Sequence, residues 1–148
     1  MPSIIPSWVY TLFASLVVGV IIVASCTLAT IDVRNEAQTQ QLTNLDEYVA
    51  TQSLELVSHA SRENQSMIQY LDLPSQVGNH VYWVYLANDS AGAWVSSGLG
   101  LTANLGQSGV NIPVQVSASG VYVSTYGRCF LECSFTNNTV NLTLSGAR

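Results

Sequence analysis

The chain has 148 residues, of which only 9% are charged, and four Lys or Arg residues against nine Asp or Glu residues give it a net charge of −5. Because so few basic residues cannot form a patch that displaces the counterions of a nucleic acid, we expect no nucleic-acid partner. The part that follows a long N-terminal segment suffices for one small domain.

The N-terminal segment is an apolar run from Ile4 to Ile31 that contains no charged residue. As a helix this run would be about 42 Å long, which exceeds the roughly 30 Å hydrocarbon core of a bilayer. It lacks the basic start and the short apolar core of a cleavable signal, so we expect it to be retained. Ser15 and Gly19 form a small-xxx-small spacing that lets two helices pack closely. Either a membrane span or a helix in a multi-subunit core fits this segment.

The next segment, from Asp32 to Tyr70, is predicted to be an amphipathic helix that continues the apolar one. There is no Gly or Pro between Val20 and Leu73 to interrupt it. The expected domains are therefore a long helix over residues 1–72, with 4–31 apolar and 32–72 an amphipathic stalk, and a head over residues 73–148. A narrow apolar stripe on the stalk can carry a head domain or a neighbouring helix, and a coiled-coil stalk remains an alternative. The stripe consists of Leu42, Leu45, Val49, Gln52 and Leu56.

Residues 73–148 have the pattern of short strands. Pro74 and Gly78 are expected to end the helix, since proline disfavours helical geometry at the residue before it. Six β-branched or aromatic runs separated by Gly, Asn and Ser turns then predict an antiparallel sandwich. The predicted fold class is α+β, with a long N-terminal hydrophobic helix followed by a small antiparallel β-sandwich head. The runs are His80 to Leu86, Ala93 to Ser97, Ile112 to Val116, Gly120 to Tyr126, Phe130 to Phe135 and Thr139 to Leu144.

Two features of the chain are typical of an extracellular protein. Cys129 and Cys133 are three residues apart, and we expect them to form a disulfide that closes a small loop. Cys26, in the apolar run, is expected to be a small buried hydrophobe. Four N-glycosylation sequons complete the pattern, and their candidate acceptors are Asn64, Asn88, Asn137 and Asn141.

The residues that carry catalysis in enzymes are not arranged in any recognisable motif. His59 lies in the predicted stalk and His80 at the start of a predicted strand, and neither has a nucleophile at a catalytic spacing. The sequence contains no phosphate-binding glycine loop and no metal-ligand cluster. We therefore expect no enzymatic activity, no cofactor and no bound metal.

The architecture resembles that of the archaeal type IV pilin and archaellin superfamily. The likeness rests on the run from Ile4 to Ile31, the polar helix to Tyr70, and the passage Leu73 to Gly78 into Val81 to Leu86. In that family the hydrophobic helices bundle in a filament core, glycosylated heads form the outer shell, and a peptidase removes a short basic leader. This sequence departs from the family because neither a basic leader nor a Gly-preceded cleavage site stands before Ile4.

The resemblance implies a structural subunit of an extracellular filament that serves surface adhesion. Such a subunit would be a homo-oligomer through its N-terminal helix and membrane-inserted before assembly, with surface glycans or a surface-layer protein as partners. The stripe from Leu42 to Leu56 would then mediate contacts between stalks and heads of successive subunits. The alternative is a single-pass anchored protein, such as the accessory proteins of the archaellum motor that grip the surface layer. An envelope or coat protein would share the same architecture.

Overall fold

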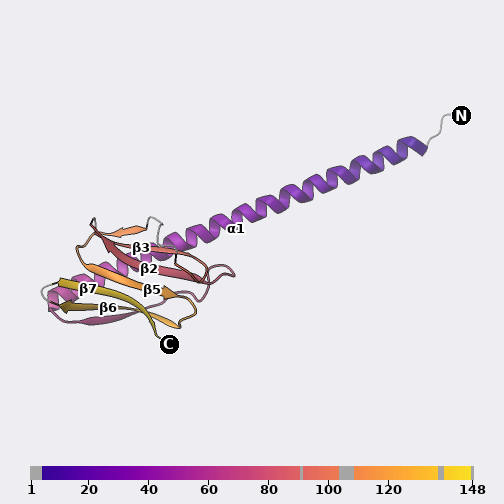
Figure 1. Ribbon diagram of the computed structural model, residues 1–148. Helices are drawn as coiled ribbons and strands as arrows, with labels where there is room; N and C mark the ends of the chain where they lie inside the picture. Colours follow the sequence, from indigo (N-terminus) through magenta and orange to yellow (C-terminus); the bar gives the residue numbers. More distant parts are fainter. Residues whose placement is uncertain (1–4, 91, 104–108, 137–138, 148) are drawn as a thin grey trace. The chain divides into compact units, whose positions relative to one another are not determined.

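The computed structural model describes residues 5–90, 92–103, 109–136 and 139–147 (Figure 1). One long helix, α1 (Ile5–Glu63), is followed by a mostly antiparallel sheet, so the predicted α+β class is confirmed. The seven strands are β1 (Met67–Leu71), β2 (Tyr82–Asp89), β3 (Gly92–Leu99), β4 (Val110–Ile112), β5 (Ser117–Val123), β6 (Arg128–Thr136) and β7 (Thr139–Ala147). Every strand except β1 overlaps a run predicted from sequence, β4 by Ile112 alone.

The chain divides into two units. The first, Met1–Ala37, holds the N-terminal part of α1, and the second, Gln38–Arg148, holds the rest of α1 together with the sheet, which we call the head. The apolar run that ends at Ile31 thus belongs to the first unit, and the expected amphipathic stalk belongs largely to the head.

The helix ends at Glu63, nine residues before the boundary expected at residue 72. Asn64 adopts a left-handed conformation, with φ of 52°, and the amide of Gln65 donates to the carbonyl oxygen of Ala60 at 3.3 Å. This is the Schellman arrangement that terminates helices, in which Asn substitutes for the more common Gly. The expectation of a helix to residue 72 was wrong because it considered only Gly and Pro as breakers.

The segment expected to be the end of the stalk is instead the edge strand β1. The side chains of Met67, Gln69 and Leu71 turn inward, and those of Ile68 and Tyr70 are exposed, which is the two-residue alternation of a strand. β1 pairs antiparallel with β6. The Gln69 amide nitrogen also donates to the side-chain oxygen of Gln52 in α1, which joins this strand to the helix.

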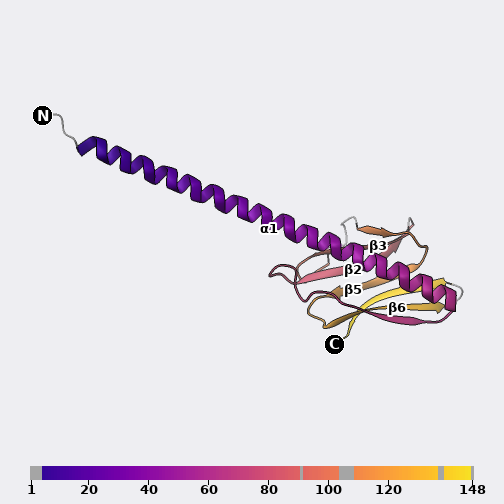
Figure 2. The same ribbon diagram turned by 180° about the vertical axis from the view of Figure 1, so that it is seen from behind.

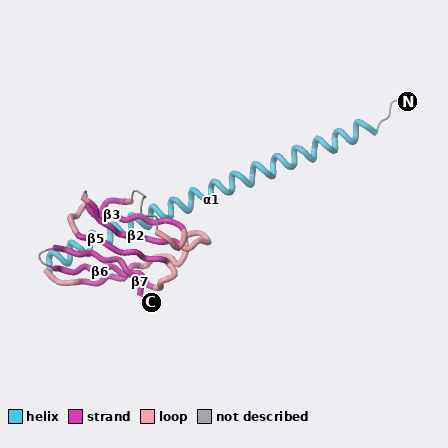
Figure 3. Tube along the Cα trace, in the orientation of Figure 1, coloured by secondary structure: helices cyan, strands magenta, loops and turns pink. Residues whose placement is uncertain are grey.

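The head has one seven-stranded sheet, in the order β1-β6-β7-β5-β2-β3-β4 (Figures 1 and 3). All neighbouring strands are antiparallel except β5 and β7, which run parallel. The expected sandwich of two sheets is therefore corrected to a two-layer head in which residues 38–63 of α1 cover one face of the sheet (Figure 2). A helix supplies the second layer because its apolar stripe buries the inward side chains of the strands.

The core of the head lies between this part of α1 and the sheet. Leu45, Val49 and Leu56 are buried there, with Leu42 packed at its margin. The stripe thus carries the head of its own chain, and the expectation that it contacts the heads of successive subunits is corrected, since Val49 is 0% and Leu56 only 5% exposed. The largest fully buried side chains on the strands are Tyr82, Leu86, Ile112, Leu131, Leu142 and Leu144.

Candidate assembly segment and head surface

The first candidate functional feature is the assembly segment, by which we mean residues 8–31 of α1. Every residue of this segment is exposed, including Trp8 at 70% and Phe13 at 67%. Its length and composition are those of a helix that can cross a membrane. The segment is therefore compatible with membrane insertion, and its apolar side chains have no partner within the part of the chain that the structure describes.

Four hydroxyl groups of the assembly segment bond to the backbone of their own helix. In each case the hydroxyl donates to a carbonyl oxygen three or four residues earlier, at 2.8 or 2.9 Å. A polar group that is already paired adds little cost when a helix enters an apolar environment. The groups concerned are those of Ser15, Ser25, Thr27 and Thr30.

The small residues of the assembly segment leave a low surface on one side. Ser15 and Gly19 are one helical turn apart, and a Cβ added at Gly19 would meet nothing within 4 Å. Such a surface permits close approach of a second helix backbone. Cys26, predicted to be buried, is instead exposed in the isolated chain.

The two cysteines of the head are free thiols, and the predicted disulfide is wrong. Cys129 and Cys133 both lie on β6 and both are buried. Four residues of extended strand separate their Cα atoms by about 13 Å, whereas a disulfide needs a separation below about 7 Å. Burial raises the pKa of the Cys129 thiol to about 12, so this thiol is neutral and packs as an apolar side chain.

The candidate glycosylation sites lie in different settings. Asn64 is exposed at the end of α1, Asn88 is exposed on β2, and Asn141 is half-buried on β7. Asn137 lies outside the described residues. Glycosylation at these positions stays a prediction, and Asn64 and Asn88 are the more accessible acceptors.

An acidic side chain that sequence analysis missed lies at the boundary between α1 and the sheet. Desolvation raises the pKa of Asp46 to about 6, against the opposing effect of hydrogen bonds from Ser97. One carboxyl oxygen of Asp46 is buried without a hydrogen-bond partner among the described residues. The sequence did contain a signal for this burial, because Asp46 falls at helical spacing between Leu42 and Val49 on the buried stripe.

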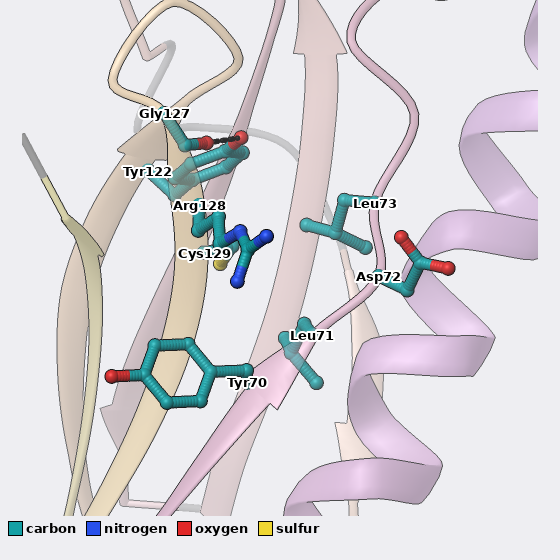
Figure 4. Close-up of a pocket in the computed structure, with 8 residues that line it drawn as sticks. All are labelled: Tyr70, Leu71, Asp72, Leu73, Tyr122, Gly127, Arg128 and Cys129. Atoms are coloured by element: carbon teal, nitrogen blue, oxygen red, sulfur yellow. Dashed lines mark hydrogen bonds between the residues drawn. The ribbon is translucent and has the colours of Figure 1, made fainter.

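A pocket of about 260 Å³ opens where β1 ends and β6 begins (Figure 4). The Tyr122 hydroxyl donates to the Gly127 carbonyl oxygen at 2.8 Å at one end of it. Asp72 and Arg128 bring opposite charges to the lining, and Figure 4 shows the Asp72 carboxylate turned toward α1. The lining contains neither Ser nor His, and its one thiol, that of Cys129, is held neutral by burial, which raises its pKa to about 12. The full lining is Tyr70, Leu71, Asp72, Leu73, Tyr122, Gly127, Arg128 and Cys129.

Among the described residues, no group of three or more His, Cys, Asp or Glu side chains is placed to hold a metal ion. His59 is exposed on α1. His80 is exposed at a turn that its backbone closes by pairing with Val77. The absence of enzymatic activity stays a prediction.

Comparisons of the chain with known protein families, with curated proteins and with solved structures find no match. The resemblance to archaeal pilins therefore stays a prediction.

Proposed function

We propose that this chain is the structural subunit of an extracellular filament of the type IV pilus kind, with apolar helices bundled in the core and heads on the outside, and that the filament serves adhesion. One observation supports the proposal above all others. The assembly segment is exposed along its whole length, whereas Leu45, Val49 and Leu56, farther along α1, are buried in the head of their own chain. The head thus has a buried core of its own, whereas the apolar side chains of the assembly segment remain exposed.

The free energy of burial gives the direction of assembly. Each Val, Leu, Ile or Phe side chain left in water forfeits about 1.5–3 kcal/mol relative to full burial. The assembly segment exposes many such side chains, so it requires either lipid or other helices. A filament core supplies other helices after the subunit leaves the membrane.

The geometry of the segment suits transfer between these two environments. Residues 8–31 form about 36 Å of helix, slightly more than a bilayer core of about 30 Å. The paired hydroxyls of Ser15, Ser25, Thr27 and Thr30 present few unsatisfied donors in either place. The low surface at Gly19 allows helix backbones to pack closely once lipid is replaced by protein.

A second candidate function is a single-pass anchored protein that displays the head outside the cell. Trp8 and Tyr10 at one end of the segment favour it, because aromatic side chains concentrate where a membrane helix meets water. Under this alternative the assembly segment stays in lipid and the protein remains dispersed in the membrane.

The test is the substitution Gly19→Leu in cells that express the protein. Because a larger side chain at this position meets nothing in its own chain, the variant should fold and insert normally but fail to form filaments. Val17→Leu, on the opposite side of the helix, is the matched control and should leave assembly intact.

The readout is electron microscopy and peptide mass spectrometry of material sheared from the cell surface, with the membrane fraction analysed in parallel. Filaments that contain the wild type and the Val17→Leu variant but not the Gly19→Leu variant support the proposal. If the wild type were recovered only from detergent-extracted membranes, the filament proposal would be wrong and the single-pass anchored protein would be favoured. Normal filaments from Gly19→Leu would refute the packing argument.

A further inference from the structure

A second, larger pocket lies in the head between α1 and the connection from β1 to β2. It has a volume of about 600 Å³, within the range of about 300–1,000 Å³ that is usual for small-molecule sites. We call it the α1 groove. Its lining is Gln41, Asn44, Leu45, Tyr48, Asp72, Pro74, Gln76, Val77 and Gly78.

The walls of the α1 groove carry five hydrogen-bonding side chains, of which all but one are neutral. Three are side-chain amides, one is the phenol of Tyr48 and one is the carboxylate of Asp72. Among the hydrogen bonds of the described residues, these five side chains take part in a single one, in which the Gln40 amide donates to the Asn44 oxygen at 3.2 Å. The remaining donors and acceptors are therefore free to bond a ligand.

The floor of the groove is apolar. Leu45 and Val77 are buried beneath it, and Pro74 adds a rigid apolar wall. Tyr48, which also lines the groove, is 38% exposed and offers an aromatic surface. An apolar floor with a few convergent polar groups is the usual construction of a site that takes one small molecule.

The wall opposite α1 is held in place before any ligand binds. The Tyr82 hydroxyl donates to the Pro74 carbonyl oxygen at 2.6 Å. Val77 and His80 exchange two backbone hydrogen bonds of 3.1 Å. Gly78, with φ of +61°, approaches α1 so closely that a Cβ there would be 2.7 Å from the Gln38 side-chain nitrogen. A preformed site loses less entropy on binding than a site that must first be ordered.

The charges of the lining restrict the ligand. No Lys, Arg or His lines the groove, so it lacks the charge-assisted donors that bind phosphate or carboxylate ligands. A single carboxylate falls short of the six to eight oxygens that Ca²⁺ usually takes. A ligand with many hydroxyl groups and an apolar C–H face uses the amides, the Asp72 acceptor and the Tyr48 ring together.

We propose that the α1 groove binds a neutral saccharide. This inference goes beyond the proposed function, because the groove lies entirely in the head and needs no filament to form. It gives the head a recognition site of its own. The saccharide has two possible sources, the surface of another cell or a glycan carried by a neighbouring copy of this chain.

The test uses the full chain, produced in a host without N-glycosylation and kept in micelles of lauryldimethylamine oxide, a detergent without a sugar headgroup. Binding is first screened on an array of neutral and acidic glycans. Hits are then titrated with the free saccharide and followed by saturation-transfer NMR. We expect neutral glycans to bind, and we expect Asp72→Ala and Gln76→Ala each to weaken binding about tenfold.

The matched control is Gln115→Ala, because Gln115 is an exposed glutamine that lines a different pocket of the head. This variant should bind as the wild type does. A second lining variant, Gln41→Trp, fills the groove and should abolish binding while circular dichroism shows a native head. Binding of acidic glycans alone, absence of any bound glycan, or wild-type affinity in the lining variants would overturn the proposal.

Glycosylated chain, concentrated until copies in different micelles contact one another, identifies the source of the saccharide. If a neighbour's glycan occupies the groove, enzymatic removal of the glycans will increase the affinity for added saccharide. If the natural ligand comes from another surface, removal will leave that affinity unchanged. Because the micelle assay contains no filaments, its failure would leave the filament proposal standing, and loss of filaments would leave saccharide binding standing.

Discussion

The backbone of Gly120 on β5 lies directly against that of Leu144 on β7. A Cβ added to Gly120 would be 2.2 Å from the Leu144 carbonyl oxygen and 2.7 Å from its nitrogen. The two residues are partners in the parallel pairing of these strands, which joins β6 and β7 to β2 and β3. Close contact at this point therefore holds the two halves of the sheet together.

We predict that Gly120→Ala destabilises the head by at least about 3 kcal/mol, because it adds a backbone clash to the strain of φ near +142°. The control is Gly100→Ala, where φ is +109° but nothing lies within 4 Å of the added carbon, and the cost should be about 1 kcal/mol. Urea unfolding of the full chain in mild detergent, followed by tryptophan fluorescence, to which the buried Trp83 contributes, measures both. An equal loss of stability in the two variants would show that backbone strain, and not the clash with Leu144, accounts for the destabilisation.

The cysteines of the head should remain reduced in the purified protein. We expect the intact mass to be unchanged by a reducing agent, and Cys129 and Cys133 to react with maleimide only after unfolding, since both are buried and the pKa of Cys129 is raised to about 12. Mass spectrometry after timed labelling gives the answer. Rapid labelling of both thiols in the native protein, or a mass gain of two hydrogen atoms on reduction, would contradict the strand geometry.

Asp46 should make the head less stable as the pH rises. Its folded-state pKa is raised from 3.8 to about 6, so the folded state binds more protons than the unfolded state between about pH 4 and 6, and the free energy of unfolding falls over that window. Because solvent still reaches the partly buried side chain, we expect a loss of about 1 kcal/mol.

The substitution Asp46→Asn should remove this pH dependence and stabilise the head at pH 7. Glu47→Gln, which changes an exposed neighbour on α1, is the charge-matched control and should preserve the slope. Urea unfolding at several pH values between 4 and 8 compares the three proteins. An unchanged slope in Asp46→Asn would assign the pH dependence to other groups.

The end of α1 should depend on the left-handed conformation of Asn64. We predict that Asn64→Gly leaves stability nearly unchanged, whereas Asn64→Val lowers it by about 1–2 kcal/mol, because a β-branched residue is strained at φ of 52°. The same unfolding assay measures both variants. If Asn64→Val were as stable as Asn64→Gly, the cap would not control where the helix ends.

Several parts of the fold could be read from local patterns. The uncharged run before Ile31, the apolar stripe that includes Leu45 and Val49, and the β-branched runs after Pro74 each predicted their element type. The local signals for β1 and for Asp46 on the buried stripe were also present. The strand was missed because the absence of Gly and Pro was taken to mean a continuous helix. Asp46 was missed because the stripe was defined without it.

The amino-acid sequence by itself determined the helix, the strands and the apolar character of the assembly segment, because hydrophobic periodicity and backbone propensity act over neighbouring residues. Only the tertiary structure decided that the strands form one sheet backed by α1, that Cys129 and Cys133 share a strand too extended for a disulfide, and that the α1 groove exists. These features depend on which distant segments of the chain come into contact. Examples are the hydrogen bond between the side chains of Gln69 and Gln52 and the one from the Tyr82 hydroxyl to the Pro74 carbonyl oxygen. Such pairings follow from the packing of the whole head, which no local pattern encodes.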